Sequence, residues 1–227
     1  MIDLYTAPTP NGHKVSCTLE AMSLDYKAHL INLSEGEQHT PEFLAISANG
    51  RIPAIVDRDN DDLSIFESGA IMIYLADKTG MLIPSEGKGR SDVIQWLMFQ
   101  MASIGPMLGQ AHHFRHYANE NIQYAINRYT NEASKIYAVL DAQLGKSQYI
   151  AGDDYSIADI AIYPWLRPQK MQGQNISHHP NIQRWYNTMR ARPAIKRGLL
   201  VMHDKVSNIR KKPVGDAWKT LFDRQSK

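Results

Sequence analysis

The segment Thr9-Pro10-Asn11-Gly12 is the first place in this sequence where residue types and spacing favour chemistry. It follows a run typical of a short strand and precedes an apolar pattern typical of a helix, so it lies at a helix start. Free N–H groups and the helix dipole favour an anion at such a position. The Thr9 hydroxyl and the Asn11 amide can also donate hydrogen bonds to a thiolate. An ordinary helix cap and turn explains the same residues.

Two further junctions carry the same ambiguity. At residues 66–69 (Phe-Glu-Ser-Gly), a strand meets a helix, and the N–H groups of Ser68 and Gly69 can hold a carboxylate. Helix capping is again the alternative. Ile52-Pro53 enters another strand, where proline as the first residue needs no special explanation. A cis bond there is uncommon in general, since only about 5–6% of X–Pro bonds are cis.

Cysteine and histidine limit the remaining chemistry. Cys17 is the only cysteine, which excludes an internal disulfide and a thiolate metal cluster. A lone cysteine on a helix is usually buried and inert. His112 and His116 stand four residues apart, a spacing compatible with a metal, but the sequence places no third ligand. We therefore expect no metal.

Short strand and helix signals alternate in the first third of the chain. Residues 2–6 alternate as a half-buried strand does, and an apolar helical pattern through Val15 and Leu19 follows the first loop. Strands are also expected at 26–33, 52–57 and 63–66, and a helix at 67–78. The resulting order β-α-β-α-β-β-α predicts a small mixed α/β sheet domain.

Strand signals stop after residue 90, which predicts an all-helical second part. A helical pattern covers 91–117, with a bend expected at Gly105-Pro106, and a second covers 122–144. Ser156 and Asp159 fit a capping box that opens a further apolar helix. Helices are also expected at 181–190 and 194–203. Residues 213–225 are either one more short helix or a mobile end.

Each motif is weak alone, but their order and spacing resemble the cytosolic glutathione transferases over residues 1 to about 205. The segments 7–15 (Ala-Pro-Thr-Pro-Asn-Gly-His-Lys-Val) and 105–114 (Gly-Pro-Met-Leu-Gly-Gln-Ala-His-His-Phe) look like the bacterial nu class. The better-known members of that class are glutathione-dependent disulfide-bond reductases. The resemblance implies a thioredoxin-like domain over 1–82, a linker over 83–90, an all-α domain over 91–205, and a basic tail over 206–227. It also implies a homodimer and a cis peptide before Pro53.

The resemblance carries over to individual residues. Thr9 and Asn11 are the expected catalytic pair that faces the glutathione sulfur. Arg51, where transferases often have Lys, preserves the charge but not the geometry. The glutathione-binding set implied is Thr9, Asn11, Gln38, Arg51, Ile52, Pro53, Glu67, Ser68 and Arg128. The second-substrate pocket implied consists of Met107, His112, His113 and Phe114.

The resulting hypothesis is a disulfide-bond oxidoreductase that uses bound glutathione, reduced or oxidised, as co-substrate. The reactive sulfur is expected to belong to glutathione because Cys17 is expected to be inert. Conjugation of glutathione to electrophiles, peroxidase activity, or glutathione-dependent ether cleavage are enzymatic alternatives. A non-catalytic interaction protein with this fold is an alternative of another class.

Composition limits the partners and the compartment. The chain has 227 residues and a net charge of +2. After Val206 there are six Lys or Arg and two Asp, a net of +4, so the rest carries −2. A basic tail on an acidic body does not favour nucleic-acid binding. We expect no membrane partner and a cytoplasmic location, because the N-terminus lacks a secretory pattern and no apolar run approaches the ~20 residues of a membrane span.

Overall fold

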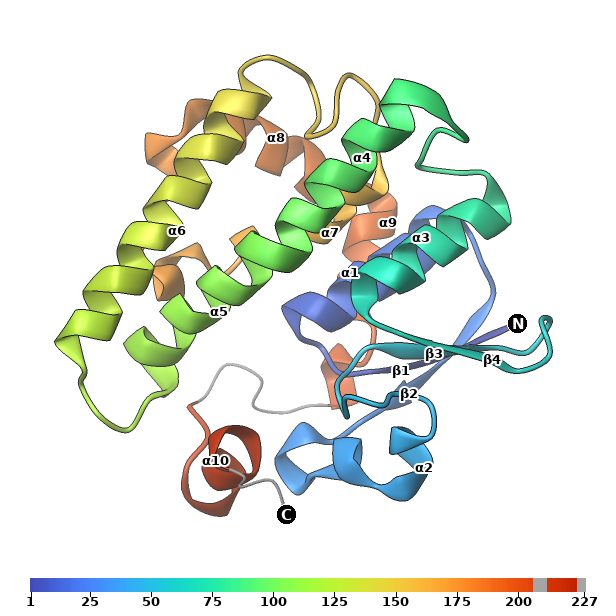
Figure 1. The fold of residues 1–227 in the computed structure, drawn as a ribbon, viewed down its shortest axis with the longest axis horizontal. Coiled ribbons are helices and arrows are strands. Elements are labelled where there is room, and N and C mark those ends of the chain that lie inside the picture. The colour runs from blue at the N-terminus through green and yellow to red at the C-terminus, as the bar shows by residue number, and fades with distance from the viewer. Residues whose placement is uncertain (206–211, 224–227) are drawn as a thin grey trace. The chain divides into compact units, whose positions relative to one another are not determined.

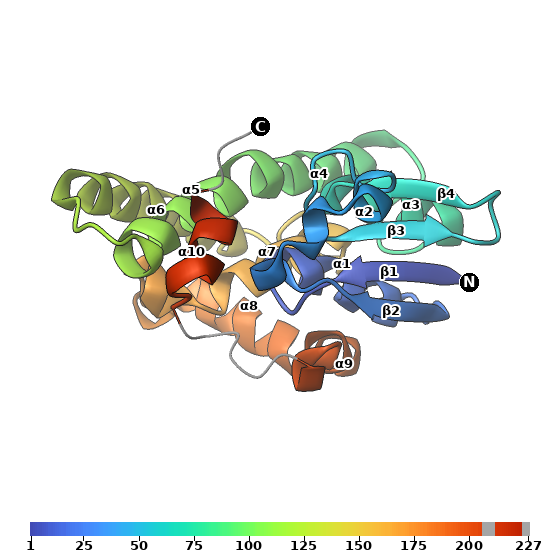
Figure 2. The same cartoon turned by 90° about the horizontal axis from the view of Figure 1, so that it is seen from below.

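The computed structural model describes residues 1–205 and 212–223, and its N-terminal part contains one four-stranded mixed sheet. The strands are β1 (Ile2–Thr6), β2 (Tyr26–Leu30), β3 (Ala54–Asp57) and β4 (Leu63–Phe66). Their order across the sheet is β2-β1-β3-β4, which Figure 2 shows. β1 pairs with β2 in parallel, whereas β3 runs antiparallel to both of its neighbours.

Contacts divide the chain into two units. The first is Met1–Tyr74 together with the described residues from Arg197 onward, and the second is Leu75–Lys196. The domain boundaries predicted from the sequence, at residues 82 and 91, remain a prediction. Within the described residues, no helix is both long and apolar enough to cross a membrane.

The helices of the first unit follow the predicted order. They are α1 (Pro10–Ala21), α2 (Pro41–Leu44) and α3 (Ser68–Thr79), the last of which crosses the boundary between the units. Figure 1 shows α1 and α3 beside the sheet. Buried apolar side chains from the strands and from both helices form the core: Leu4, Val15, Leu19, Ile55, Ile71 and Met72. The predicted mixed α/β domain is confirmed.

Two strands are shorter than predicted: β3 begins at Ala54 instead of residue 52, and β2 ends at Leu30 instead of residue 33. Ile31 N–H, just after β2, still donates to Thr6 C=O. The strand goes no further because the chain then turns into two short 3₁₀ helices. These are η1 (Leu33–Glu35) and η2 (Glu37–His39), which precede α2.

Of the two alternatives for residues 213–225, the short helix is present in the described part of the C-terminal segment. α9 (Pro193–Leu200) and the 3₁₀ turn η7 (His203–Lys205) precede α10 (Gly215–Phe222). α10 packs against η1 within the first unit. Residues 206–211 and 224–227 of the basic tail lie outside the described residues.

The second unit is helical, as predicted. Its α-helices are α4 (Gly87–Phe99), α5 (Gly105–His112), α6 (Gln123–Leu144), α7 (Ile157–Leu166) and α8 (Pro180–Ala191), with four short 3₁₀ or π segments between them. α4 begins at Gly87, inside the segment expected to be a linker. Figure 1 shows α4 continuing into α5, with α6 alongside.

The bend expected at Gly105-Pro106 takes the form of a π-helical turn. η3 (Gln100–Ile104) joins α4 to α5, and a second π turn, η4 (His113–Tyr117), follows α5. Pro106 has no N–H to donate into the preceding turn, so the regular α-helical bonding is interrupted there.

The capping box at the start of α7 is confirmed. The Ser156 hydroxyl accepts from Ala158 N–H, and the Asp159 carboxylate accepts from Ser156 N–H. Asp159 is fully buried and also accepts from Ile150 N–H and from the indole N–H of Trp185. This carboxylate therefore joins α7 to α8 and to the loop before it.

Candidate functional site

The register of the sheet places three predicted site segments at one edge. Tyr5, near the end of β1, lies opposite Ala54 at the start of β3. Phe66, the last residue of β4, lies opposite Ala54 from the other side. The loop after β1, the Ile52-Pro53 segment before β3, and the start of α3 after β4 therefore meet at the same sheet edge.

Thr9 caps α1, so the cap predicted as the alternative is present. Its Oγ1 accepts from Gly12 N–H at 3.2 Å, and Pro10 occupies the first turn. Since the hydroxyl oxygen accepts from the backbone, its O–H keeps the capacity to donate outward. Capping and sulfur recognition are therefore compatible at Thr9, and Asn11 is half-buried in the same turn.

Gly12 is required by a close approach of two backbones. A Cβ at this position would lie 2.1 Å from Ala7 C=O and 2.5 Å from the Thr6 hydroxyl. The first turn of α1 can thus pack directly on the end of β1 only with glycine here, which fixes the position of Thr9 and Asn11.

The start of α3 holds a residue in an unusual backbone conformation. Glu67 has φ of 69°, in the left-handed region that a non-glycine residue seldom adopts. Its C=O accepts from Ile71 N–H, so Glu67 acts as the helix cap while its side chain is exposed. Such strain, of order 1–3 kcal/mol, concentrates at functional sites. Ser68 follows, buried, where first-turn N–H groups lack intrahelical partners.

Lys14 lies beside the candidate site, although the sequence pattern did not single it out. Its Nζ lies 3.3 Å from the Ser68 hydroxyl, so one turn beyond Asn11 the helix α1 contacts the start of α3. Only 1% of Lys14 is exposed. Burial lowers the pKa of Lys14 to about 7, and the nearby Glu67 carboxylate partly opposes that shift. The signal available in the sequence was a single basic residue inside an otherwise uncharged stretch of helix.

The segment before β3 has the predicted cis peptide between Ile52 and Pro53. The Ser47 hydroxyl fixes this segment, because it donates to Arg51 C=O at 2.9 Å and accepts from Arg51 N–H. The Ile52 backbone makes no hydrogen bond with another described residue. Its N–H and C=O are therefore available to an extended ligand, whereas the Arg51 side chain is exposed.

Gln38 is buried in η2, with only 6% of its surface exposed. Its Nε2 donates to Leu33 C=O at 3.3 Å, but its Oε1 has no hydrogen-bond partner among the described residues. A buried acceptor without a partner is costly, so this oxygen is a candidate for a ligand N–H.

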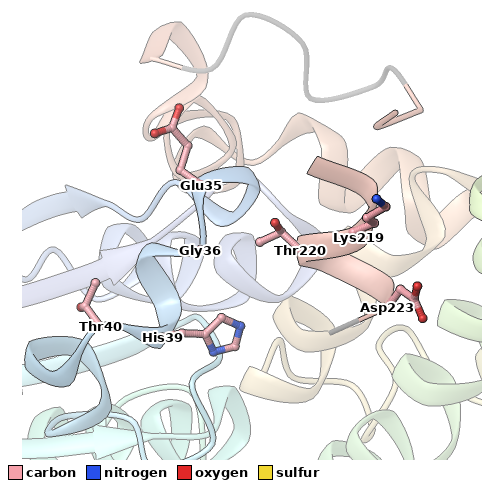
Figure 3. Close-up of a pocket in the computed structure, with 7 residues that line it drawn as sticks. All are labelled: Glu35, Gly36, His39, Thr40, Lys219, Thr220 and Asp223. Atoms are coloured by element: carbon pink, nitrogen blue, oxygen red, sulfur yellow. The ribbon is translucent and has the colours of Figure 1, made fainter. Parts of the chain in front are cut away.

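A pocket of about 480 Å³ lies beside the Gln38 segment (Figure 3). One wall comes from residues 35–40, and the other comes from Lys219 and Thr220 of α10 and from Asp223, which follows that helix. In the described part of the basic tail, α10 thus packs against η1 and faces His39 of η2, the 3₁₀ turn that carries Gln38, across this pocket. The pocket is lined by Glu35, Gly36, His39, Thr40, Lys219, Thr220 and Asp223.

Cys17 is buried, as predicted, with no exposed surface. Gly198 covers it so closely that a Cβ on Gly198 would lie 2.5 Å from Cys17 Cα. The Ser16 hydroxyl donates to Gly198 C=O at 2.7 Å and holds this contact in place. The thiol therefore has no route to a substrate disulfide in this conformation.

The residues predicted for a second-substrate pocket differ from one another in the side chains that they contact. Met107 lines a groove of about 340 Å³ together with residues of α6, including Ile136 and Val139. Phe114 stacks on Tyr129 of α6 at 5.5 Å between ring centroids, and His113 meets Phe114 edge-on. Their role in binding a second substrate remains a prediction.

His112, the fourth member of that set, is buried and stacks on Trp165 at 6.1 Å. Burial lowers the pKa of His112 to about 4, and the nearby His116 adds to that shift, whereas a hydrogen bond from the ring to the Pro168 carbonyl partly opposes it. His112 is therefore neutral near pH 7.

Arg128, which is expected to bind glutathione, is exposed on α6, and its role remains a prediction. In the described part of the chain, no group of three or more His, Cys, Asp or Glu side chains is arranged to hold a metal ion.

Comparison with known proteins defines the class of protein that this fold and site belong to. The model of the glutathione S-transferase N-terminal domain matches residues 1–77, and that of the C-terminal domain matches residues 104–193. The chain therefore belongs to the glutathione S-transferase family.

Individual relatives cover most of the chain. It is 48% identical over 204 residues to the disulfide-bond oxidoreductase YfcG of Escherichia coli, covering 88% of this chain and 95% of the relative. It is 38% identical over 215 residues to the disulfide-bond oxidoreductase YghU of the same organism, covering 88% and 74%.

Solved structures agree with these relatives. A glutathione transferase family member from Pseudomonas fluorescens, crystallised with two glutathione bound, matches with a TM-score of 0.83 and 46% identity, covering 87% of this chain and 92% of that one. A glutathione transferase from Pseudomonas putida, with one glutathione disulfide per subunit, matches with a TM-score of 0.82 and 40% identity, covering 87% and 90%.

Proposed function

We propose that this protein reduces disulfide bonds with glutathione, using the thiolate of bound glutathione and no protein cysteine. The observation that carries the proposal is the meeting of three segments at one sheet edge: the Thr9 loop, Ile52-Pro53 and the start of α3. The names of the relatives YfcG and YghU, both disulfide-bond oxidoreductases, support the reaction type.

Glutathione fits this edge as an extended peptide with a carboxylate at each end. The Ile52 N–H and C=O bind its cysteinyl unit as an added strand would. The first-turn N–H groups of α3 and the Ser68 hydroxyl hold the γ-glutamyl carboxylate, and the exposed Glu67 carboxylate binds the adjacent ammonium.

The other end of the ligand lies towards Gln38 and Arg51. The exposed guanidinium of Arg51 attracts the glycyl carboxylate. The Oε1 of Gln38, which has no partner among the described residues, accepts an amide N–H of the ligand. With both ends held, the thiol is directed to the Thr9 hydroxyl and the Asn11 amide at the start of α1.

Positioning of the sulfur contributes more to the rate than acidification. A thiol with a pKa near ~8.5 is only a few per cent thiolate at pH 7. Lowering that pKa by ~2 units raises the thiolate fraction roughly 20-fold but reduces nucleophilicity roughly 8-fold, for a Brønsted slope of about 0.4–0.5. Since the net gain is only two- to threefold, orientation of the sulfur along the S–S axis must supply most of the effect.

The reaction balances without a protein redox group. The bound thiolate attacks one sulfur of the substrate disulfide, the S–S bond breaks, and the leaving thiolate takes a proton from solvent. A second glutathione thiolate then attacks the mixed disulfide, which yields glutathione disulfide and a second substrate thiol. A relative from Burkholderia graminis crystallised with two glutathione molecules per subunit, and one from Pseudomonas fluorescens crystallised with two glutathione bound, support a site with room for both units.

The alternatives use the same thiolate on a different target. Conjugation to an electrophile or reduction of a hydroperoxide needs the same sulfur site, and the walls of the second-substrate pocket would select between them. The candidates for those walls are Met107, His112, His113 and Phe114. A non-catalytic interaction protein would not need an intact sulfur site, so Thr9, Asn11, Glu67 and Ser68 favour an enzyme.

Three finer features belong to the same proposal: the nu class, a cytoplasmic location and a homodimer. Segments 7–15 and 105–114 support the class. Exposed Met98 and Val139, the latter in the groove that Met107 lines, support a partner surface on the second unit, and Arg128 would reach a glutathione across such a dimer. Light scattering after gel filtration should give twice the chain mass of 25.7 kDa, and a monomer mass would contradict the homodimer.

The direct test compares three reactions of the purified protein with glutathione. Reduction of 2-hydroxyethyl disulfide is coupled to glutathione reductase and NADPH, and is compared with conjugation to 1-chloro-2,4-dinitrobenzene and with cumene hydroperoxide reduction. We expect kcat/KM to be highest for the disulfide. A protein that binds glutathione but favours another substrate would refute the assigned reaction, and one that binds neither glutathione nor its disulfide would support the interaction protein.

A further inference from the structure

Lys14 is buried in α1, where a charged side chain is energetically unfavourable. Every residue from Gly12 to Leu19 is buried, and Lys14 itself is 1% exposed. Lysine is almost never fully buried unless it is paired, because removing an ammonium group from water is costly. An apolar side chain of similar length, such as methionine, would fill the same space without that cost. A buried amine at this position therefore indicates a functional role.

The contacts of the Lys14 amine point towards the glutathione site. Its Nζ donates to the Ser68 hydroxyl at 3.3 Å, from behind the first turn of α3. The carboxylate of Glu67, from the same helix start, favours the charged form of this amine. Both residues are proposed above to hold the γ-glutamyl end, so Lys14 stands directly behind that part of the site.

We propose that Lys14 is a positioning residue that binds a proton when the γ-glutamyl carboxylate of glutathione binds to Ser68. The inference rests on the proposed function, because it takes the ligand and its orientation from there. The Lys14 ammonium donates to the Ser68 oxygen, which strengthens the hydrogen bond that the Ser68 O–H donates to the ligand carboxylate. The proton comes from solvent and is released again when the ligand leaves.

Physical chemistry fixes the direction of the coupling. Burial brings the pKa of Lys14 to about 7 before the ligand arrives, so the amine is only partly protonated at neutral pH. A carboxylate bound within a few ångströms raises the pKa of an amine by roughly 1–3 units. Binding at pH 7.5 should therefore take up roughly 0.5–0.8 proton. By the same linkage, glutathione affinity should fall as the pH rises from about 7 to about 9.

Calorimetry with S-methylglutathione tests this coupling. The methyl group removes thiol ionisation, so the ligand cannot release that proton on binding. Titrations at pH 7.5 in two buffers with different ionisation enthalpies give the number of protons exchanged. The matched variant is Lys14→Met, and Lys14→Gln serves if the first does not fold. Protons exchanged by the ligand amine are common to all three proteins, so the difference between wild type and variant belongs to Lys14.

We expect roughly half a proton or more taken up by the wild type and not by the variant. The variant should bind about tenfold more weakly at pH 6, consistent with loss of a charge-assisted hydrogen bond, and within about twofold of wild type at pH 9. Binding by the wild type without proton uptake, or equal uptake by both proteins, would refute the role of Lys14 while leaving the proposed function intact. Absence of binding would refute both. A purely structural lysine would change stability but not the proton count.

Discussion

Replacing Asp159 with alanine should lower the temperature at which the second unit unfolds well below that of the wild type. The carboxylate accepts four hydrogen bonds: from Ile150 N–H at 2.9 Å, from Ser156 N–H and hydroxyl at 3.0 and 3.1 Å, and from the Trp185 indole at 2.8 Å. All of these bonds are buried, so Asp159→Ala leaves donors that water cannot reach.

The magnitude follows from those donors. Each buried donor without a partner costs about 1–3 kcal/mol, and partial relaxation keeps the sum below simple addition, so we expect a loss of about 3–5 kcal/mol. For a chain of this size each kcal/mol shifts the melting temperature by about 2–4 °C, so the expected shift is roughly 6–20 °C.

Circular dichroism during heating and in urea measures both quantities. Asp154→Ala is the matched control, because Asp154 is exposed in the same loop. The control should unfold within about 0.5 kcal/mol of the wild type, as surface substitutions usually do. A loss below about 1 kcal/mol for Asp159→Ala would show that the buried carboxylate does not join these segments as described.

Two other substitutions test different contacts. Gly198→Ala should destabilise by about 1–3 kcal/mol, because the new Cβ would lie 2.5 Å from Cys17 Cα, whereas Gly109→Ala meets only ordinary contacts and should be nearly neutral in urea unfolding. His112→Gln should reduce the loss of stability that the protein shows in acid. The pKa of His112 is about 4 in the folded protein against an ordinary 6.5, so between these values the unfolded chain binds a proton that the folded chain does not. The free energy of unfolding of the wild type therefore falls as the pH drops from about 6.5 to 4. Urea unfolding at pH 7.5 and pH 5 measures this effect. Equal losses of stability in the wild type and the variant would contradict the lowered pKa of His112.

Much of the fold was predictable because its signals are local. Alternation marks β1, turn residues separate β3 from β4, and Ser156 with Asp159 forms a capping box within four residues. Each of these patterns reflects contacts between near neighbours in the chain. The cis peptide before Pro53 is different, since the residues alone do not favour it and only the family resemblance implied it.

The missed features depend on contacts between distant segments. α1 is buried along most of its length, so it lacks the polar face that would have placed Lys14 by periodicity. The partner of Lys14 is Ser68, 54 residues away. The burial of Gln38 likewise depends on two 3₁₀ turns whose polar sequence gives no apolar pattern. The sequence could therefore name most of the candidate site but not the amine behind it.

The measurement that tests the central claim most directly is disulfide reduction by the Cys17→Ser variant, with Cys17→Ala as a second replacement. Reduction of 2-hydroxyethyl disulfide by glutathione is followed through NADPH oxidation, and folding is checked by circular dichroism. If glutathione supplies the nucleophile, both variants should retain at least about half of the wild-type kcat/KM. Asn11→Ala should instead lose about tenfold or more, as expected for removing a hydrogen bond to a charged sulfur. A folded Cys17 variant that lost more activity than Asn11→Ala would contradict the account, because the reacting sulfur would then belong to the protein.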